Sequence, residues 1–328
     1  MTVSPATIAV IIPFYQRSAE PLVRAIRSIL AQQEVARPLV LIVDDGSPVP
    51  ARQIVAEHFP AHEDCLRIIE QPNAGAATAR NTGLDNVPDG VNQIAFMDSD
   101  DEWSSHHLAH AQRLYEQGYE FYFADHQRGE WPTGKFAMLE FPGSQHRCLD
   151  EAAGLYEYRG NFLLPVMSDH LVQTSSVVCS NRVIRNLRFP VGLVLGEDEI
   201  VWIKALRAAG KIGFCNRVEA LMGKGVNISQ MNQDGGQWGD ERAFQLMAQN
   251  FKYWQHVGEL LPDEPELEQL RKSKLQQLGR HFSASVLHRL RRGQSLPMRH
   301  LISVTLTSPG WLLSLPAVLS GRLTKENT

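Results

Sequence analysis

The sequence predicts an α/β domain, built on a mainly parallel, Rossmann-like sheet flanked by helices, with a C-terminal helical appendage. Two observations predict the domain: short runs of Val, Ile and Leu alternate with amphipathic segments in the first third of the chain, and polar residues follow each run. The appendage is predicted because the chain becomes helical and basic beyond about Gly239. We therefore expect a first domain over residues 1–238 and a helical region over residues 239–328.

The apolar runs have the length and the Val and Ile content of buried strands in a parallel sheet. Between the first two runs, Leu22, Ile26 and Ile29 recur at helical spacing. Further helical patterns cover residues 50–59 and 76–84. This alternation of strand and helix predicts a doubly wound sheet with helices packed on its faces. The predicted strands are Ile8–Ile12, Leu39–Val43, Leu66–Ile69 and Ile94–Met97.

The second half of the domain is less regular. Residues 119–164 are rich in Gly, Pro and aromatic side chains without a clear period, which indicates strands and loops over the site. Residues 196–206 predict a helix that ends before Gly210, and residues 212–215 predict the strand that follows. The late helix and strand complete the predicted domain.

Composition narrows the function. Hydrophobic residues make up 43% of the chain and charged residues 21%, which is typical of a folded globular protein. The net charge of -4 gives no field that would attract nucleic acid, so we expect no nucleic-acid partner. The four cysteines form no CxxC pair, and no signal peptide is visible at the N-terminus. These features favour a reducing, cytoplasmic setting.

Polar residues gather after the predicted strands, at the sheet edge where α/β proteins bind ligands. The acidic run Asp98–Asp101 is the clearest case, because carboxylates two residues apart can share a hard divalent cation, here Mn²⁺ or Mg²⁺. The alternative is that Ser99 or Asp100 caps a helix containing Trp103 and Leu108. An EF-hand fits poorly, since Trp103 stands where that loop needs Gly.

Three further groups each allow two interpretations. Asp44 and Asp45 form a turn or bind a nucleotide, although no GxGxxG or Walker A motif is present. Arg80 binds a diphosphate or makes a structural ion pair. Asp198 acts as a general base, or its carboxylate and that of Glu197 simply favour the first turn of a helix.

His106, His107 and His110 place two imidazoles on one helical face. We expect an exposed polar face there rather than a metal site.

In combination, these motifs resemble family 2 glycosyltransferases of the GT-A fold, of the bacterial cell-surface polysaccharide type. They occur in the family's order over about two-thirds of the chain, and their joint specificity is high although each alone is weak. The matching motifs are Val10–Tyr15, Val43–Ser47, Asn73–Gly75, Ala79–Leu84, Phe96–Asp101 and Gly196–Asp198.

The resemblance implies inverting transfer of a sugar from a nucleoside diphosphate sugar, expected to be a UDP-sugar, to a hydroxyl of a glycan or lipid-linked acceptor. A nucleotidyltransferase and a non-catalytic nucleotide-sugar binding protein are the alternatives. Asp98 and Asp100 are the expected metal ligands and Asp198 the expected base, with Asp44, Asp101 and Glu197 as additional candidates. The expected donor nucleotide-binding residues are Pro13, Tyr15, Arg17, Asp45, Asn73, Gly75, Arg80, Asp98, Ser99 and Lys224.

One segment departs from the family pattern. Family members often carry a His after the late strand, whereas this chain has Lys224 there. We expect Lys224 to meet the phosphates directly, which would weaken the dependence on metal.

The C-terminal tail has two interpretations. Residues 301–321 contain no charged side chain, but Pro309, Gly310 and Pro316 make a membrane-spanning helix costly. Trp311, Leu312, Leu313 and Leu315 lie close to a basic helix, which predicts peripheral attachment to the inner face of the cell membrane. The alternative is a helical cap packed on the catalytic domain or on a partner.

Overall fold

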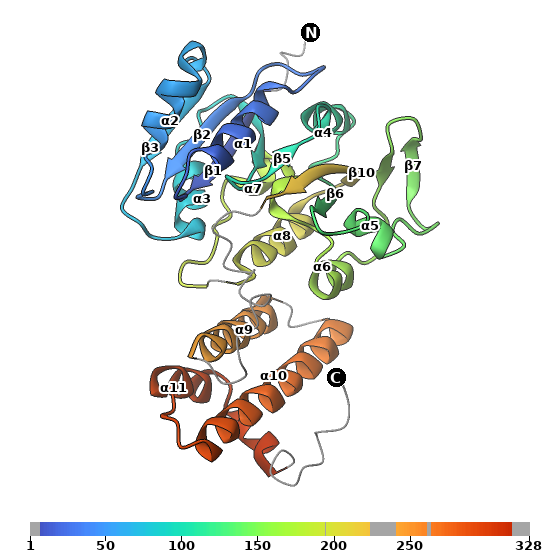
Figure 1. Cartoon of the computed structure of the whole chain (residues 1–328). Coiled ribbons are helices and arrows are strands. Elements are labelled where there is room, and N and C mark those ends of the chain that lie inside the picture. Colours follow the sequence, from blue (N-terminus) through green and yellow to red (C-terminus); the bar gives the residue numbers. More distant parts are fainter. Residues whose placement is uncertain (1–6, 194, 224–240, 261–263, 317–328) are drawn as a thin grey trace. The chain divides into compact units, whose positions relative to one another are not determined.

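The computed structural model describes residues 7–193, 195–223, 241–260 and 264–316, and the chain forms two compact units (Figure 1). The first unit comprises Met1–Val191 and Val201–Val226, and the second comprises Gly192–Ile200 and Asn227–Thr328. The boundary predicted at residues 238 and 239 falls at the edge of a stretch outside the described residues and stays a prediction.

The first unit alternates strands with helices along the chain. Its strands are β1 (Thr7–Phe14), β2 (Leu39–Asp44), β3 (Leu66–Glu70), β4 (Val91–Phe96), β5 (Glu102–Trp103), β6 (Phe121–Arg128), β7 (Arg147–Asp150), β8 (Leu155–Glu157), β9 (Val178–Ser180) and β10 (Ile212–Met222). Its helices are α1 (Glu20–Leu30), α2 (Ala51–His58), α3 (Ala76–Asp85), α4 (His107–Glu116), α5 (Lys135–Met138), α6 (Leu163–Asp169), α7 (Asn181–Ile184) and α8 (Glu197–Ala208), the last of which begins in the second unit.

These strands form one mixed sheet in the order β3-β2-β1-β4-β9-β6-β10-β8-β7, with β5 paired to β10. The neighbours β3, β2, β1 and β4 are parallel, as predicted, so their carboxyl ends meet at one edge. Strand β9 is antiparallel to both β4 and β6, which makes β6 run in the same direction as β4. Strand β10 is parallel to β6. The predicted α/β fold is confirmed, and its site edge extends from β3 to β10.

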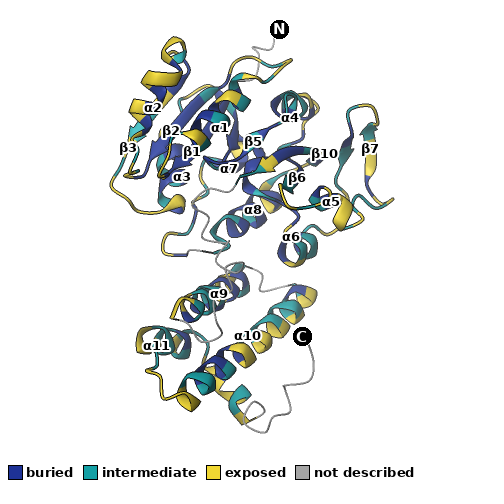
Figure 2. Ribbon diagram, viewed as in Figure 1, coloured by how far each residue is buried: buried dark blue, intermediate teal, exposed yellow. Residues whose placement is uncertain are grey.

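Burial explains why these segments adopt their structures. Figure 2 shows β1 and β2 almost entirely buried, as expected for strands covered on both faces. Leu22, Ile26 and Ile29 form the buried stripe of α1. Helix α3 approaches the sheet closely because Gly83 has no side chain: a Cβ there would lie 2.4 Å from Cγ2 of Ile11.

Trp103 departs from the helical alternative. Although that interpretation placed Trp103 inside a helix, the residue lies in β5 opposite Ala220 of β10. The helix begins only at His107. The acidic run is therefore followed by a short strand that ties it to the far part of the sheet.

The second unit is helical beyond Gly239, as predicted. It contains α9 (Glu241–Leu260), α10 (Pro265–Arg291), α11 (Met298–Thr307) and the 3₁₀ segment η4 (Pro309–Ser314). An apolar core forms around Phe282, whose ring packs edge-on against Phe244 and Trp311. Among the described residues, no helix is both long and apolar enough to cross a membrane.

Candidate active site

The acidic run Asp98–Asp101 follows β4, and its first residue is paired with a buried arginine, Arg80. Arg80 of α3 donates from Nη2 to Oδ1 of Asp98 at 2.7 Å, and the Arg80 side chain is only 5% exposed. The guanidinium also lies 5.4 Å from the ring centroid of Phe189. The ion-pair interpretation of Arg80 is therefore observed, and the pair fixes the guanidinium beside Asp98, the predicted metal ligand, whereas diphosphate binding by Arg80 stays a prediction.

Asp101, the last residue of the run, links it by hydrogen bonds to other parts of the first unit. Its carboxylate accepts hydrogen bonds from Oγ of Ser175, Nε2 of Gln173 and the backbone N–H of Gly223. Burial, followed by the charges of Asp98 and Asp100, raises the pKa of the Asp101 carboxyl well above its usual value. Negative charge is thus crowded in this loop.

The crowding fits a divalent cation. An ion bound by Asp98 and Asp100 would relieve the repulsion that they exert on Asp101. Carboxylate oxygens are the ligands that Mg²⁺ and Mn²⁺ prefer in proteins. The chemistry of this donor set therefore agrees with the predicted metal.

Gly223 supports the loop from β10. A Cβ at this position would lie 1.9 Å from the backbone oxygen of Asp100, which rigid backbone does not accommodate. We expect Gly223→Ala to shift the Asp100 peptide and to weaken metal-dependent nucleotide binding at least about tenfold, as measured by calorimetry. Gly310→Ala is the matched control, since a Cβ there meets nothing within 4 Å. Equal affinity in both variants would contradict the supporting role.

Gln16 joins the end of β1 to the loops that follow β4 and β2 by hydrogen bonds. Nε2 of Gln16 donates to Oγ of Ser99, and the backbone N–H of Gln16 donates to Oγ of Ser47. The neighbouring side chains of Tyr15 and Arg17 are both exposed. Pro13, by contrast, is buried.

The two candidate aspartates at the end of β2, Asp44 and Asp45, both accept hydrogen bonds from backbone N–H groups. Asp44 accepts from the N–H groups of Ser47 and Ala51. Asp45 accepts from the N–H groups of Ala74 and Gly75, each at 2.8 Å, and from Nε2 of Gln71. The turn interpretation therefore holds for Asp44, while Asp45 fixes the loop ahead of α3.

Asn73 and Gly75 complete that loop. Nδ2 of Asn73 donates to the backbone oxygen of Asp45 at 2.9 Å. Gly75 has a φ of 90°, a conformation that favours glycine. The sheet edge thus brings together the predicted residues from β1, β2, α3 and β4.

The remaining candidates belong to the second unit or lie outside the described residues. Glu197 and Asp198 occupy the first turn of α8, in the segment Gly192–Ile200 that groups with the second unit. Next to them, Glu199 accepts a hydrogen bond from the hydroxyl of Tyr253. Lys224 lies outside the described residues.

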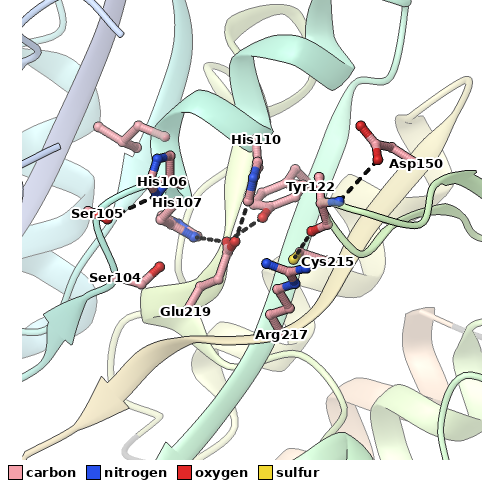
Figure 3. A network of polar contacts seen from close by, with 12 residues as sticks. Ser104, Ser105, His106, His107, His110, Tyr122, Asp150, Cys215, Arg217 and Glu219 are labelled. Atoms are coloured by element: carbon pink, nitrogen blue, oxygen red, sulfur yellow. Dashed lines mark hydrogen bonds and ion pairs between the residues drawn. The ribbon is translucent and has the colours of Figure 1, made fainter. Parts of the chain in front are cut away.

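The histidines of α4 correct one expectation. Instead of lining an exposed face, His107 is fully buried and its Nδ1 lies 2.9 Å from Oε2 of Glu219, which is itself 2% exposed. Nδ1 of His110 and the hydroxyl of Tyr122 also contact this carboxylate, and Figure 3 shows all three side chains converging on it. The expectation was wrong for His107 and His110, because their buried partner lies on β10, far along the chain, whereas the His106 side chain is 40% exposed.

This cluster also includes potential metal ligands. Among the described residues, ligand atoms of His110, Cys215 and Glu219 lie within 4.8 Å of one another. Two histidines and a tyrosine already contact the Glu219 carboxylate, so we interpret the group as a buried clamp between α4, β6 and β10.

Four site residues were not among the candidates: Gln16, Gln173, Ser175 and Gly223. Gln16 could have been found from the sequence, because it lies between the candidates Tyr15 and Arg17. Gln173 and Ser175 act from a short segment before β9, and Gly223 acts from the end of β10. No local pattern distinguishes these three from ordinary loop residues.

Comparison with known proteins identifies the family. The family model described as "Glycosyl transferase family 2" matches residues 9–178, just over half of the chain. The chain belongs to glycosyltransferase family 2. This glycosyltransferase is 30% identical over 258 residues to the "Succinoglycan biosynthesis protein ExoW" of Rhizobium meliloti (strain 1021), and the match covers 76% of each chain.

Solved structures share the fold of this family 2 glycosyltransferase. S. aureus TarS 1-349 in complex with UDP-GlcNAc has a TM-score of 0.55 at 15% identity, covering 96% of this chain and 92% of that one. The mannosyltransferase PcManGT from Pyrobaculum calidifontis, in complex with GDP-Man and Mn²⁺, has a TM-score of 0.54 at 14% identity, covering 99% and 91%. This chain spans 53% of a longer TarS chain.

Proposed function

We propose that this glycosyltransferase moves a sugar from a nucleoside diphosphate sugar, a UDP-sugar, to a hydroxyl of a glycan or lipid-linked acceptor in cell-surface polysaccharide synthesis. The observation that carries the proposal is the ion pair between the buried Arg80 and the partly exposed Asp98, next to Asp100, at the sheet edge that also presents Tyr15. The fold shared with TarS bound to UDP-GlcNAc supports a UDP-sugar donor, and the name of ExoW supports a polysaccharide product.

The first strands would hold the nucleotide. The exposed ring of Tyr15 offers a surface for the base, and the Asp45 carboxylate fixes the backbone of Ala74 and Gly75 in the loop ahead of α3. Because both Asp45 oxygens already accept hydrogen bonds, its main contribution to binding is the shape of this loop. Ser99, fixed by Gln16, would face the ribose.

The charged groups would stabilise the diphosphate as it leaves. Asp98 and Asp100 would hold the divalent metal, which supplies positive charge to the leaving group when it is bound. Arg80 is already held in place by Asp98 and therefore needs little reorganisation when negative charge develops. Lys224 is proposed as a further phosphate contact.

Inversion requires a base on the acceptor side. We assign this role to Asp198, with Glu197 as the neighbouring alternative, on the family resemblance and on their place in the first turn of α8. The Asp198 carboxylate would accept the acceptor's hydroxyl proton while the acceptor oxygen forms its bond to C1 and the bond from C1 to the diphosphate breaks.

Product analysis tests this function. The full chain would be incubated with Mn²⁺, a panel of UDP-, GDP- and dTDP-sugars, and simple glycoside acceptors. Proton NMR would then give the anomeric configuration of any product. The proposal predicts one preferred donor and a product of opposite configuration at C1. A product with retained configuration would refute the inverting mechanism.

The second unit carries the proposal of peripheral membrane contact. From Gln269 to Lys325 the sequence contains no Asp or Glu. The basic residues of α10 in this stretch include Arg271, Lys272, Lys274, Arg280, Arg289 and Arg291. On α11, Met298, Ile302 and Leu306 are 54%, 52% and 80% exposed at intervals of one helical turn. A unit that combines basic charge with an exposed apolar stripe suits an anionic lipid surface.

The exposed apolar residues of α11 are not the ones that the sequence of the tail predicts for membrane contact, which include Trp311. Trp311 is buried against Phe282, and its backbone oxygen accepts a hydrogen bond from Ser283, so this ring belongs to the core of the second unit. Leu313 is 85% exposed instead. The membrane-facing residues are thus proposed on α11 and at Leu313.

Vesicle flotation tests the contact. The full chain should bind vesicles of phosphatidylcholine with phosphatidylglycerol, and not phosphatidylcholine alone, with release at high salt. Ile302→Ser combined with Leu306→Ser should lower binding at least about tenfold, because both apolar side chains leave the lipid. Val191→Ser, at an equally exposed position of the first unit, should change nothing. Binding that ignores both lipid charge and the double variant would contradict the contact.

A further inference from the structure

A second cluster of charge lies at the same sheet edge, after β6. Because β6 runs in the same direction as β4, its last residues reach the edge at which Asp98–Asp101 lie. The register places Arg128 of β6 opposite Met222 of β10. The next residue, Gly223, donates its backbone N–H to Asp101 at 2.8 Å. The end of β6 is therefore one strand away from the acidic run.

Two cations are held there by one aromatic ring. The guanidinium carbon of Arg128 lies 5.5 Å from the ring centroid of Trp131, and Nζ of Lys135 lies 5.9 Å from it. Both distances fall within the range of cation–π attraction. In the part of the chain that the structure describes, neither Arg128 nor Lys135 has a carboxylate partner. Their charges are thus positioned without being neutralised.

The backbone fixes this arrangement. Asp125, which is 3% exposed, accepts hydrogen bonds from the N–H groups of Phe136 and His126. Gly134 allows the close approach, since a Cβ there would lie 2.1 Å from Oδ2 of Asp125. The turn that carries Lys135 is therefore held against the end of β6, and Trp131 closes a further turn by donating its N–H to the Arg128 oxygen.

A buried histidine completes the cluster. The ring of His126 packs 5.9 Å from that of Trp131, and among the described residues its buried Nδ1 has no hydrogen-bond partner. Burial, followed by the positive charges of Lys135, Arg128 and His170, lowers the pKa of His126 to about 3. Its imidazole is therefore neutral at physiological pH, and the surroundings are electropositive. The two cations beside Trp131, Arg128 and Lys135, favour an anionic ligand at this place.

We propose that Arg128 and Lys135, mounted on Trp131, bind an anionic group of the acceptor, either a phosphate or a carboxylate. This inference rests on the proposed function and names the acceptor class. In the sheet order, β4 and β9 separate β6 from β1, β2 and β3, where the nucleotide would bind. The β6 cluster thus lies on the other side of the acidic run, where an acceptor approaching C1 would lie.

Two acceptor types carry such a group. A lipid-linked glycan carries a diphosphate, and an acidic polysaccharide carries sugar carboxylates. Arg128 suits both because a guanidinium forms paired hydrogen bonds with phosphate and with carboxylate oxygens. The shared chemistry is therefore an anion held by one guanidinium and one ammonium group.

Calorimetry on the full chain separates the possibilities. The enzyme would first be saturated with UDP and Mn²⁺, and then titrated with geranyl diphosphate, methyl glucuronide or methyl glucoside. We expect binding of one of the anionic probes, weakened at least about tenfold in Arg128→Gln combined with Lys135→Gln, and no binding of methyl glucoside. Preference for geranyl diphosphate would identify a lipid-linked diphosphate, and preference for methyl glucuronide an acidic sugar.

The control is Lys211→Gln. Lys211 makes a comparable cation–π contact, 5.4 Å from the ring centroid of Tyr119, but it lies just before β10 at the opposite edge of the sheet. Probe affinity should be unchanged in this variant. UDP affinity should be unchanged in all variants, and absence of UDP binding in the wild type would count against the proposed function itself. UDP binding without anionic-probe binding, or with equal probe affinity in the double variant, would overturn the acceptor assignment alone.

Discussion

Asp198→Asn is expected to lower kcat by about 10²–10⁴-fold, the usual range for removal of a general base. The amide keeps the shape of the carboxylate but cannot take the acceptor's proton, so donor binding should change little. Steady-state kinetics with the preferred donor would measure kcat and KM, and calorimetry would measure UDP affinity. Loss of kcat with unchanged UDP affinity is the signature of a group that acts only in the transition state.

Glu197→Gln serves as the comparison, because Glu197 shares the first turn of α8 with Asp198. We expect it to retain most of the wild-type kcat. If Asp198→Asn retained kcat within about threefold while Glu197→Gln lost it, the base would be Glu197. If neither variant changed kcat, the proposed direct displacement with a base in this turn would be contradicted.

Glu219→Ala is expected to destabilise the first unit by about 3–5 kcal/mol, because it removes one member of a buried charged network and leaves the others without their acceptor. The residues affected are His107, His110 and Tyr122. Urea unfolding would measure the change in free energy, with Glu63→Ala on the surface as the control. A change under about 1 kcal/mol would show that the network contributes little.

The same clamp should affect the site. It holds α4, which follows the acidic run, and β5 pairs with Ala220 and Leu221 directly after Glu219. A loosened clamp would release the segment after Asp101. We therefore expect Mn²⁺-dependent nucleotide binding to fall in Glu219→Ala even at temperatures at which the chain stays folded.

The effect of pH on this clamp has a defined sign. Burial alone would raise the pKa of Glu219, but the hydrogen bonds with His107 and His110 outweigh it, and the pKa lies below its ordinary value of 4.5. A lowered pKa in the folded state stabilises the protein above about pH 4.5, and this stability is lost as the pH falls below that value. The difference in stability between wild type and Glu219→Gln should therefore shrink between about pH 4.5 and pH 3.

The features that could be predicted from the sequence are those that depend on local residue patterns, namely the first four parallel strands and the polar residues at their ends. The runs at β1 to β4 have a composition that identifies strands, and parallel strands necessarily bring their polar carboxyl ends together. For that reason the sequence alone groups Asp45, Asn73, Arg80 and Asp98 at one edge of the sheet. The link between Arg80 and Asp98 follows from the same topology, since α3 packs on β1 through Gly83.

What the sequence could not predict depends on pairs that are distant along the chain. The histidines of α4 look like a polar surface until β10 brings Glu219 beside them. Gly223 looks like an ordinary loop residue, although its missing side chain is what lets β10 approach Asp100. Such contacts are set by tertiary packing, which helical and strand periodicity do not encode.

Binding of nucleoside diphosphates with and without Mn²⁺ is the most direct test of the donor site. Calorimetry would compare UDP, GDP and dTDP on the wild type, on Asp100→Asn and on the surface control Glu63→Ala. We expect metal-dependent binding of one nucleotide, UDP, which is unchanged in Glu63→Ala and at least about tenfold weaker in Asp100→Asn. Absence of binding by every nucleotide in the presence of Mn²⁺, or equal affinity in Asp100→Asn, would contradict the assignment of this sheet edge as the donor site.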